Sequence, residues 1–232
     1  MNRKQLLLLS MLLVAGKIIG MQAPSEGVVT KINDYDTSHK DAVMDIAFQD
    51  PYKFFCGSFV VEKGYMPEEQ FISENRKGME AILTNPLQIK KVLINNAKVA
   101  GFLEFYKSKE LSLESLKSMM ESKGLPPCDE NQMLAAMPHL KRTNAECEEF
   151  GLIGCVAVSR EFRGKGYGRT LLKFGLDEIK TLWPHIKQAR LEVNAANEVA
   201  RKLYETEGFV ASAIQPAHLV HMHAIQYEKS LK

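Results

Sequence analysis

The chain has 232 residues, of which 45% are hydrophobic and 25% carry a charge. This composition is typical of a globular domain with a full apolar core, and it excludes a disordered, fibrous or disulfide-dense protein. The formal net charge is only +2, and three of the cations lie in the first twenty residues, where there is no acid. This balance gives no reason to expect binding to a nucleic-acid backbone.

The first residues have the features of an export signal. A cationic start with Arg3 and Lys4 precedes a Leu-rich run over residues 5–16, which is the order found in signal peptides. The apolar run is too short to cross a bilayer comfortably, and Lys17 interrupts its continuation. We interpret residues 1–23 as a signal peptide or an uncleaved N-terminal anchor, with a buried N-terminal helix or a misassigned start as alternatives. A signal peptide predicts a periplasmic or secreted protein; otherwise the chain is expected in the cytoplasm.

From about residue 27 the sequence alternates between strand-like and helix-like segments, which favours a mixed α/β domain. A first strand is predicted over residues 28–32. The helix predicted over residues 36–49 begins at Asp36, a suitable N-cap, and Pro51 ends it. A second helix is predicted over residues 67–85, because a proline at its start and acidic residues in its first turn favour helix initiation.

Two β-rich segments, residues 87–94 and 98–107, follow the second helix. Asn95 and Asn96 stand between them, and asparagine tolerates the backbone of a tight turn. The pattern therefore predicts a β-hairpin.

An irregular segment rich in Ser, Met, Lys and Glu occupies residues 108–150. It is far longer than the usual connection of a hairpin, so we interpret it as an insertion. One short helix is predicted within it, over residues 113–122. Two interpretations of the insertion remain open: a lid that faces the substrate, or a surface excursion without such a role.

The last third of the chain returns to a regular pattern. The predicted elements are a strand (152–158), a helix (168–183), a strand (189–194), a helix (197–207) and two final strands (209–214 and 219–228). Cys155 falls inside the first of these strands and is expected to be a small buried hydrophobe. No linker or internal repeat divides the elements, so we predict one domain over residues 27–232.

The strongest local motif is Arg163-Gly164-Lys165-Gly166-Tyr167-Gly168, between an apolar strand and an amphipathic helix. A strand that turns through glycines into a helix presents several unpaired N–H groups at the positive end of the helix dipole. Glycine lets a phosphate oxygen approach the backbone and tolerates positive φ. Each amide hydrogen bond to a charged group contributes about 1.5–3 kcal/mol, and Arg163, Lys165 and Arg169 add positive charge. The motif predicts a diphosphate cradle.

Two common cradles are absent from the sequence. No GxxxxGK string followed by Ser or Thr exists, and the glycines do not form GxGxxG. The pattern RxxGxG, with Val156-Ala157-Val158 before it and Leu171-Leu172 after it, instead resembles motif A of the GNAT N-acetyltransferases. Downstream, the residues that resemble motif B of this family are Leu191-Glu192-Val193, Asn197, Ala200, Leu203-Tyr204 and Gly208-Phe209. A capped helix explains each residue of motif B singly, but it does not explain both motifs in this order.

The resemblance implies the GNAT fold, an α/β (α+β) architecture. A mixed, mostly antiparallel sheet of six to seven strands is flanked by about four helices, here with an insertion between strands 3 and 4. In this fold the fourth and fifth strands separate, and the pantetheine arm of acetyl-CoA lies between them. Residues 152–209 would form this acetyl-CoA-binding core. The residues so assigned to acetyl-CoA are Val156, Val158, Arg163, Gly164, Lys165, Gly166, Tyr167, Gly168, Arg169 and Asn197.

The resemblance also implies an activity: transfer of the acetyl group of acetyl-CoA to a primary amine of a small molecule or protein, by direct attack in a ternary complex. Tyr204 matches the tyrosine that protonates the leaving thiolate in many relatives. Because an amine with a pKa near 10.4 is almost wholly protonated at neutral pH, a base is expected. Some relatives carry a glutamate in the fourth strand, where this chain has none. The candidates are Glu148 and Glu149, just before that strand, and Glu104 on the preceding one.

The expected partners are acetyl-CoA and an amine acceptor, with no nucleic acid and no metal. His221 and His223 alternate on the last strand, but two ligands do not make a metal site. The chain is expected to be a monomer or a homodimer, and to touch a membrane only through an uncleaved N-terminal segment. A second hypothesis is a non-catalytic acyl-CoA binding or sensing module. Export would conflict with both hypotheses, because acetyl-CoA is a cytosolic metabolite.

Overall fold

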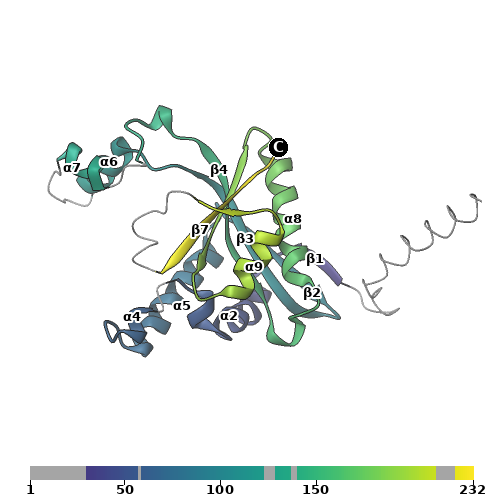
Figure 1. The fold of residues 1–232 in the computed structure, drawn as a ribbon. Coiled ribbons are helices and arrows are strands. Elements are labelled where there is room, and N and C mark those ends of the chain that lie inside the picture. The colour runs from purple at the N-terminus through teal and green to yellow at the C-terminus, as the bar shows by residue number, and fades with distance from the viewer. Residues whose placement is uncertain (1–29, 57–58, 123–128, 137–139, 213–222) are drawn as a thin grey trace, which may run out of the picture.

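The computed structural model describes residues 30–56, 59–122, 129–136, 140–212 and 223–232, and Figure 1 draws the other residues as a grey trace. The predicted signal peptide or anchor at residues 1–23 lies outside the described residues and stays a prediction. No helix in the described ranges is both long enough and apolar enough to cross a membrane.

A single sheet of seven strands forms the centre of the molecule, in the order β1-β2-β3-β4-β5-β7-β6. Neighbouring strands are antiparallel except β4 and β5, which run parallel. This confirms the predicted mixed, mostly antiparallel sheet. The strands are β1 (Thr30–Asp34), β2 (Ile89–Asn95), β3 (Lys98–Lys109), β4 (Glu149–Val158), β5 (Gln188–Asn194), β6 (Val210–Ala211) and β7 (Ala224–Ser230).

Four helices correspond to the predicted flanking helices: α2 (Lys40–Phe48), α5 (Glu68–Thr84), α8 (Tyr167–Leu182) and α9 (Glu198–Thr206). Four shorter ones accompany them among the described residues: α3 (Pro51–Phe54), α4 (Phe59–Glu62), α6 (Leu113–Ser122) and α7 (Glu130–Ala136). Single 3-10 turns lie at Thr37–His39, Asn144–Glu146 and Arg160–Phe162.

Helices cover both faces of the sheet, and each face has its own apolar core. On one face, Leu171, Leu172 and Ile179 of α8 pack against residues such as Leu103. On the other face, α2 and α5 pack against β2 and β3 (Figure 1) through Val43, Met44, Ala47, Met79, Leu83, Val92 and Phe102. Each fully buried aliphatic or aromatic side chain contributes about 1.5–3 kcal/mol.

The hairpin turn lies one residue later than predicted. Asn95 is the last residue of β2, and Asn96 and Ala97 form the turn with φ of 47° and 63°, as two-residue hairpin turns require. The reason is the side chain of Asn95, whose Nδ2 donates to Tyr167 Oη at 2.6 Å and to Thr30 Oγ1 at 3.1 Å. These long-range bonds hold Asn95 in the sheet.

Pro51 both follows the end of α2 and begins α3, a short helix that the sequence did not reveal. Asp36 is an N-cap as predicted, but it caps the 3-10 turn ahead of α2, with Oδ1 accepting from Ser38 N at 2.8 Å. The predicted strands at 209–214 and 219–228 extend into residues 213–222, which lie outside the described part of the chain, as does His221.

The insertion is shorter and more regular than predicted. Residues 107–109 pair with residues 149–151, so Glu149 and Phe150 belong to β4. Between the two strands, α6 was expected and α7 was not; both project away from the sheet in Figure 1. They share a small core of their own, formed by Leu113, Met133 and Leu140.

Candidate functional site

Strands β4 and β5 pair over three residues and then part. The parallel register joins Gly151, Leu152 and Ile153 to Ala189, Arg190 and Leu191 and stops there. At the next residue, Gly154, the ladder with β3 has a bulge, because Cys155 is opposite Glu104 and Ile153 is opposite Phe105. A bulge bends the strand that carries it. β4 therefore turns away from β5, as the resemblance implies.

A cavity of about 470 Å³ lies at this gap. Its walls come from the end of β4, the glycine loop, the start of α8, the first turns of α9 and the α2–α3 connection. Nine of the ten residues assigned to acetyl-CoA from the sequence line the cavity, and Lys165 does not. Tyr204 lines it as well, together with residues that the sequence did not indicate as part of the site, among them Asp50, Lys53 and Phe54.

The glycine loop offers a row of free backbone donors to this cavity. The N–H groups of residues 164–169 donate to no acceptor among the described residues, and Thr170 N makes the first bond of α8, to Gly166 O at 3.0 Å. Gly164 and Gly166 have φ of 77° and 81°, and a Cβ at either would meet nothing within 4 Å. The glycines are thus required by the backbone, and the open space before them fits an anion.

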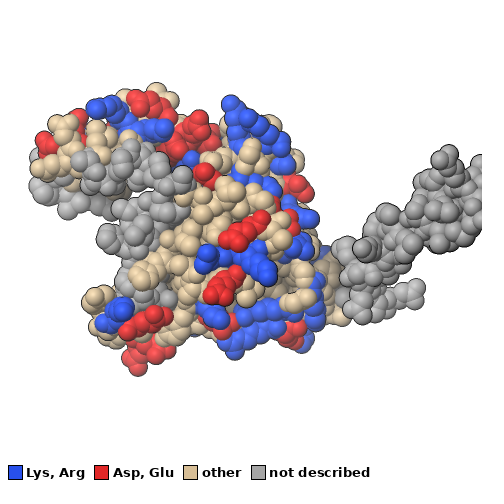
Figure 2. All heavy atoms as spheres, viewed as in Figure 1, with Lys and Arg blue, Asp and Glu red and all other residues tan. Residues whose placement is uncertain are grey.

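The three cations of the loop each have a partner on another side chain. Arg163 donates to the Asp50 carboxylate and, through Nε, to Val158 O at 3.0 Å. Arg169 Nε lies 2.6 Å from Glu207 Oε1, and Lys165 Nζ lies 5.1 Å from the centre of the Phe162 ring. Figure 2 likewise shows acids interspersed among the bases on the face it presents. The backbone amides of the loop, rather than its side-chain cations, are therefore the donors without a partner among the described residues.

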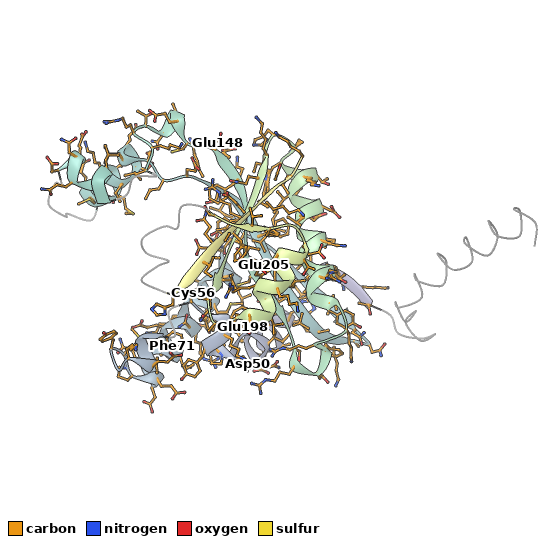
Figure 3. All side chains as sticks on the ribbon, in the orientation of Figure 1. Asp50, Cys56, Phe71, Glu148, Glu198 and Glu205 are labelled. Carbon is orange, nitrogen blue, oxygen red and sulfur yellow. The ribbon has the colours of Figure 1, made fainter. Side chains whose placement is uncertain are left out.

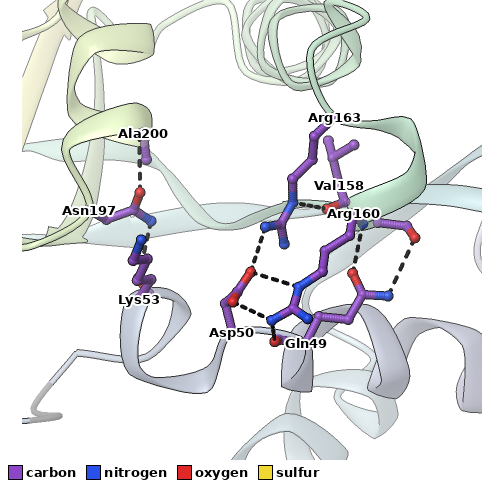
Figure 4. Close-up of polar contacts among 9 residues, drawn as sticks. Gln49, Asp50, Lys53, Val158, Arg160, Arg163, Asn197 and Ala200 are labelled. Atoms are coloured by element: carbon purple, nitrogen blue, oxygen red, sulfur yellow. Dashed lines mark hydrogen bonds and ion pairs between the residues drawn. The ribbon is translucent and has the colours of Figure 1, made fainter.

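Asp50 ties the α2–α3 connection to the loop before α8. Its carboxylate accepts hydrogen bonds from Arg160 and Arg163, and these bonds lower the pKa of Asp50 to about 2. Gln49 reinforces the contact, because its Oε1 accepts from Arg160 N at 2.7 Å (Figure 4). The aspartate is therefore ionised at every working pH, and its charge is compensated by two guanidinium groups.

Two asparagines hold the other end of α3. Asn194 at the end of β5 donates from Nδ2 to Tyr52 O at 2.9 Å and to Phe55 O at 3.1 Å. Asn197 accepts from Ala200 N at 3.2 Å as the N-cap of α9 and donates to Lys53 O at 3.0 Å (Figure 4). Helix α3 thus bridges the gap from the β4 side to the β5 side, and Asn197 has a structural role beside any contact with the cofactor.

Tyr204 projects from α9 into the cavity and is only 7% exposed. Burial raises the pKa of its hydroxyl, and negative charge on Cys155 or Cys56 would raise it further. The phenol is therefore protonated at neutral pH. No described residue forms a hydrogen bond with this hydroxyl, so it is available as a donor within the cavity.

Glu104 is a buried acid beside the point where β4 and β5 part, although it does not itself line the cavity. It is 1% exposed, and burial raises its pKa to about 7 against the opposing effect of Lys90. Oε1 is buried without a hydrogen-bond partner, whereas Oε2 lies 2.0 Å from the position that a Cβ at Gly154 would take. The carboxyl group thus occupies the place of a side chain on β4, at the point where β4 leaves β5.

The other two acids proposed as bases lie elsewhere. Glu148 sits at the end of the sheet beside α6, and Figure 3 separates it clearly from Asp50 and Cys56. Glu149 lies 2.9 Å from His185 Nε2 and also contacts Lys107, and these contacts lower its pKa. Neither residue lines the cavity. Within the described residues, no three His, Cys, Asp or Glu side chains gather as a metal site would require.

Comparison with known proteins agrees with this geometry. Residues 61–209 match the family model described as the acetyltransferase (GNAT) family, whereas no curated protein sequence matches the chain. Two solved structures share the fold with a TM-score of 0.52 and 14% identity. PaiA N-acetyltransferase from Thermoplasma acidophilum, in complex with coenzyme A, aligns over 87% of this chain and 99% of its own.

The second structure is an acetyltransferase of the GNAT family from Staphylococcus aureus Mu50, aligned over 88% of this chain and 100% of its own. At 14% identity the two structures are evidence for the fold alone. The family match covers well over half of the chain. The parted strands, the glycine cradle and the cavity lie within or beside the matched residues. The chain belongs to the acetyltransferase (GNAT) family.

Proposed function

We propose that the chain transfers the acetyl group of acetyl-CoA to a primary amine of a small molecule or protein, by direct attack in a ternary complex. The observation that carries the proposal is the cavity between the parted strands. Its lining includes Tyr204 and five residues of the glycine loop whose amides donate to no described acceptor, namely Gly164, Gly166, Tyr167, Gly168 and Arg169. Holding donor and acceptor together at one site removes much of the entropic barrier to their reaction.

The glycine loop would bind the diphosphate of acetyl-CoA, and the edge of β4 would bind the pantetheine arm that follows the diphosphate. Beyond Ile153 the edge of β4 that faces β5 has no strand partner in the described part of the chain, so an extended amide-bearing chain can pair there. Because the carbonyl of Val158 already accepts a hydrogen bond from Arg163, the pantetheine arm would pair with the backbone nearer Val156. This arm would carry the thioester toward Tyr204, deeper in the same cavity.

Tyr204 acts on the leaving sulfur. As the amine nitrogen bonds to the thioester carbon and the C–S bond breaks, negative charge develops on sulfur. A phenol with a pKa near 10 is a weaker acid than a thiol near 8.5, and burial raises the pKa of Tyr204 further. Complete proton transfer from Tyr204 is therefore uphill. Its contribution is a hydrogen bond to the sulfur as the charge forms, and solvent supplies the proton afterwards.

Glu104 receives the proton from the amine. A lysine-like amine is only about 0.04% neutral at pH 7, a cost of about 4.6 kcal/mol, so a nearby base matters. A base works best when its pKa is close to the working pH, and burial raises the pKa of Glu104 to about 7. Its position in place of a side chain at Gly154 puts it beside the gap in the sheet. None of the three candidate acids lines the cavity. We favour Glu104 over Glu148 and Glu149 because it is buried at the bulge where β4 leaves β5.

The second hypothesis, a non-catalytic acyl-CoA binding module, is separated from the first by two measurements on one sample. Isothermal titration with acetyl-CoA reports binding. Release of free thiol, followed with polyamine, aminoglycoside and peptide amines in turn, reports transfer. Binding with amine-dependent thiol release supports the transferase, whereas binding without release from any amine supports the sensor.

A further inference from the structure

Lys90 is the cross-strand partner of the buried acid. In the antiparallel ladder of β2 and β3, Lys90 is directly opposite Glu104. Side chains in such a pair lie on the same face of the sheet, with Cβ atoms about 4.5–5.5 Å apart. The pair therefore places an ammonium stem beside a carboxyl group that is 1% exposed.

The ammonium of Lys90 is fixed by a helix rather than by the carboxylate. Its Nζ donates to Asn85 O and, at 3.4 Å, to Ile82 O. Helix α5 ends at Thr84, so these are carbonyls at a helix C-terminus, where a cation is favoured by the dipole. No ion pair joins Lys90 to Glu104 among the contacts of the described residues. The Lys90 ammonium is therefore held by α5 on the same face of the sheet as Glu104, and it forms no ion pair with the Glu104 oxygens.

Two other titratable groups near Glu104, Tyr106 and Cys155, are neutral at working pH, and Glu192 on β5 is an acid that acts on Tyr106. Tyr106 lies on the same strand, and burial raises its pKa to about 12. Cys155 faces Glu104 from β4, and burial raises the pKa of its thiol well above the ordinary value. The nearby packing residues of α2, such as Val43 and Ala47, are apolar. Among the described residues, Lys90 is the one whose charge favours the ionised form of Glu104.

We infer that Lys90 is a positioning residue that acts through Glu104: its ammonium, anchored on the last carbonyls of α5, favours the ionised form of the buried carboxyl group near neutral pH, so that Glu104 can accept a proton. That Glu104 accepts a proton during acetyl transfer rests on the proposed function, whereas the effect of Lys90 on the ionisation of Glu104 does not. Without the cation, burial alone would act on Glu104, and the acid would hold its proton to higher pH.

The test replaces the charge while keeping a donor for α5. Lys90→Gln can still donate to the helix carbonyls, and Lys90→Arg keeps the charge. Lys91→Gln is the matched control, because Lys91 is the next residue of the same strand and pairs instead with Asp34 at 2.8 Å. The ionisation of Glu104 is followed by carbon-detected NMR of glutamate carboxyls in the cofactor-free protein, with Glu104→Gln to assign the signal.

We expect the titration midpoint of Glu104 to rise by about one pH unit in Lys90→Gln, which is a tenfold change in its ionisation constant. Lys90→Arg and Lys91→Gln should remain at the wild-type midpoint. An unchanged midpoint in Lys90→Gln would overturn the inference. An equal rise in Lys90→Arg would also overturn it, because packing rather than charge would then be the cause.

Activity gives a second, separate readout. If the chain transfers acetyl groups, the acidic limb of kcat/KM against pH should move upward in Lys90→Gln by the same amount as the NMR midpoint. If no amine is acetylated by the wild type, the proposed function fails while the NMR result still decides the inference. Far-UV circular dichroism of each variant verifies that α5 is intact, and Lys90→Met provides a further neutral variant should Lys90→Gln not fold.

Discussion

Oε2 of Glu104 lies 2.0 Å from the position that a Cβ on Gly154 would occupy. An acid on β3 therefore fills the place of a side chain on β4, at the bulge where β4 leaves β5. Glycine at position 154 and glutamate at position 104 are two parts of one arrangement, because a side chain at position 154 would exclude the carboxyl group of Glu104 from its present place.

Gly154→Ala tests this arrangement directly. The new methyl group would force the carboxyl group of Glu104 to move, because real Cβ contacts are never so short. We expect kcat to fall at least tenfold, in line with the contribution of a displaced base, with little change in the Kd of acetyl-CoA. Gly78→Ala is the matched control, since a Cβ at Gly78 meets nothing within 4 Å. Equal kcat in both variants would contradict the arrangement.

Glu104→Gln should change how stability depends on pH. Burial raises the pKa of Glu104 from 4.5 to about 7, so the folded protein binds a proton that the unfolded chain releases between these values. The stability that the protonated form provides is present below about pH 4.5 and is lost as pH rises to about 7, a change of about 3 kcal/mol. Urea unfolding from pH 5 to pH 8 should show this decline in the wild type relative to Glu104→Gln. Parallel curves would show that Glu104 titrates normally.

Tyr204→Phe should slow turnover without abolishing it. The variant loses a hydrogen bond to the leaving sulfur, which solvent replaces in part, so we expect kcat to fall by about tenfold, below the usual contribution of a full general acid. The KM for acetyl-CoA should change little, because the hydroxyl acts on charge that develops during the reaction. The measurement is kcat across pH, and a kcat equal to that of the wild type at every pH would remove Tyr204 from the mechanism.

Gly166→Ala should weaken cofactor binding. Gly166 has φ of 81°, and an L residue in this region costs about 1–2 kcal/mol. Relief of that strain would turn the loop amides away from the diphosphate. Gly64→Ala carries a similar backbone cost, with φ of 74°, outside the residues that line the cavity. Calorimetry should show a higher Kd for acetyl-CoA in Gly166→Ala alone; equal Kd values in the two variants would place the diphosphate elsewhere.

The cofactor half of the site could be predicted from sequence because its signals are local. Glycines at 164, 166 and 168 and the apolar face of α8 each follow from neighbouring residues, and the structure places them around one cavity. The hairpin turn was predicted one residue early because the side chain of Asn95 bonds to Tyr167, far away in sequence. Helix α3 was not predicted because four residues give no periodicity, and it is held by Asn194 and Asn197.

The base could not be selected from sequence for a related reason. Glu104, Glu148 and Glu149 are all acids on or beside strands, and nothing local distinguishes them. The distinction comes from burial, from the register that puts Glu104 opposite Cys155, and from the missing side chain at Gly154. Each of these depends on contacts between strands. The partners of Arg163 and Arg169 could not be predicted for the same reason, because Asp50 and Glu207 lie on other elements.

The central claim is that this cavity transfers acetyl groups to amines, and mass spectrometry of the acceptor tests it most directly. The purified chain is incubated with isotopically labelled acetyl-CoA and a panel of amines, beside Glu104→Gln and Gly166→Ala. We expect a labelled N-acetyl product from at least one amine, with a much lower rate in both variants. Binding of acetyl-CoA without a labelled product from any amine, or equal rates in all three proteins, would contradict it.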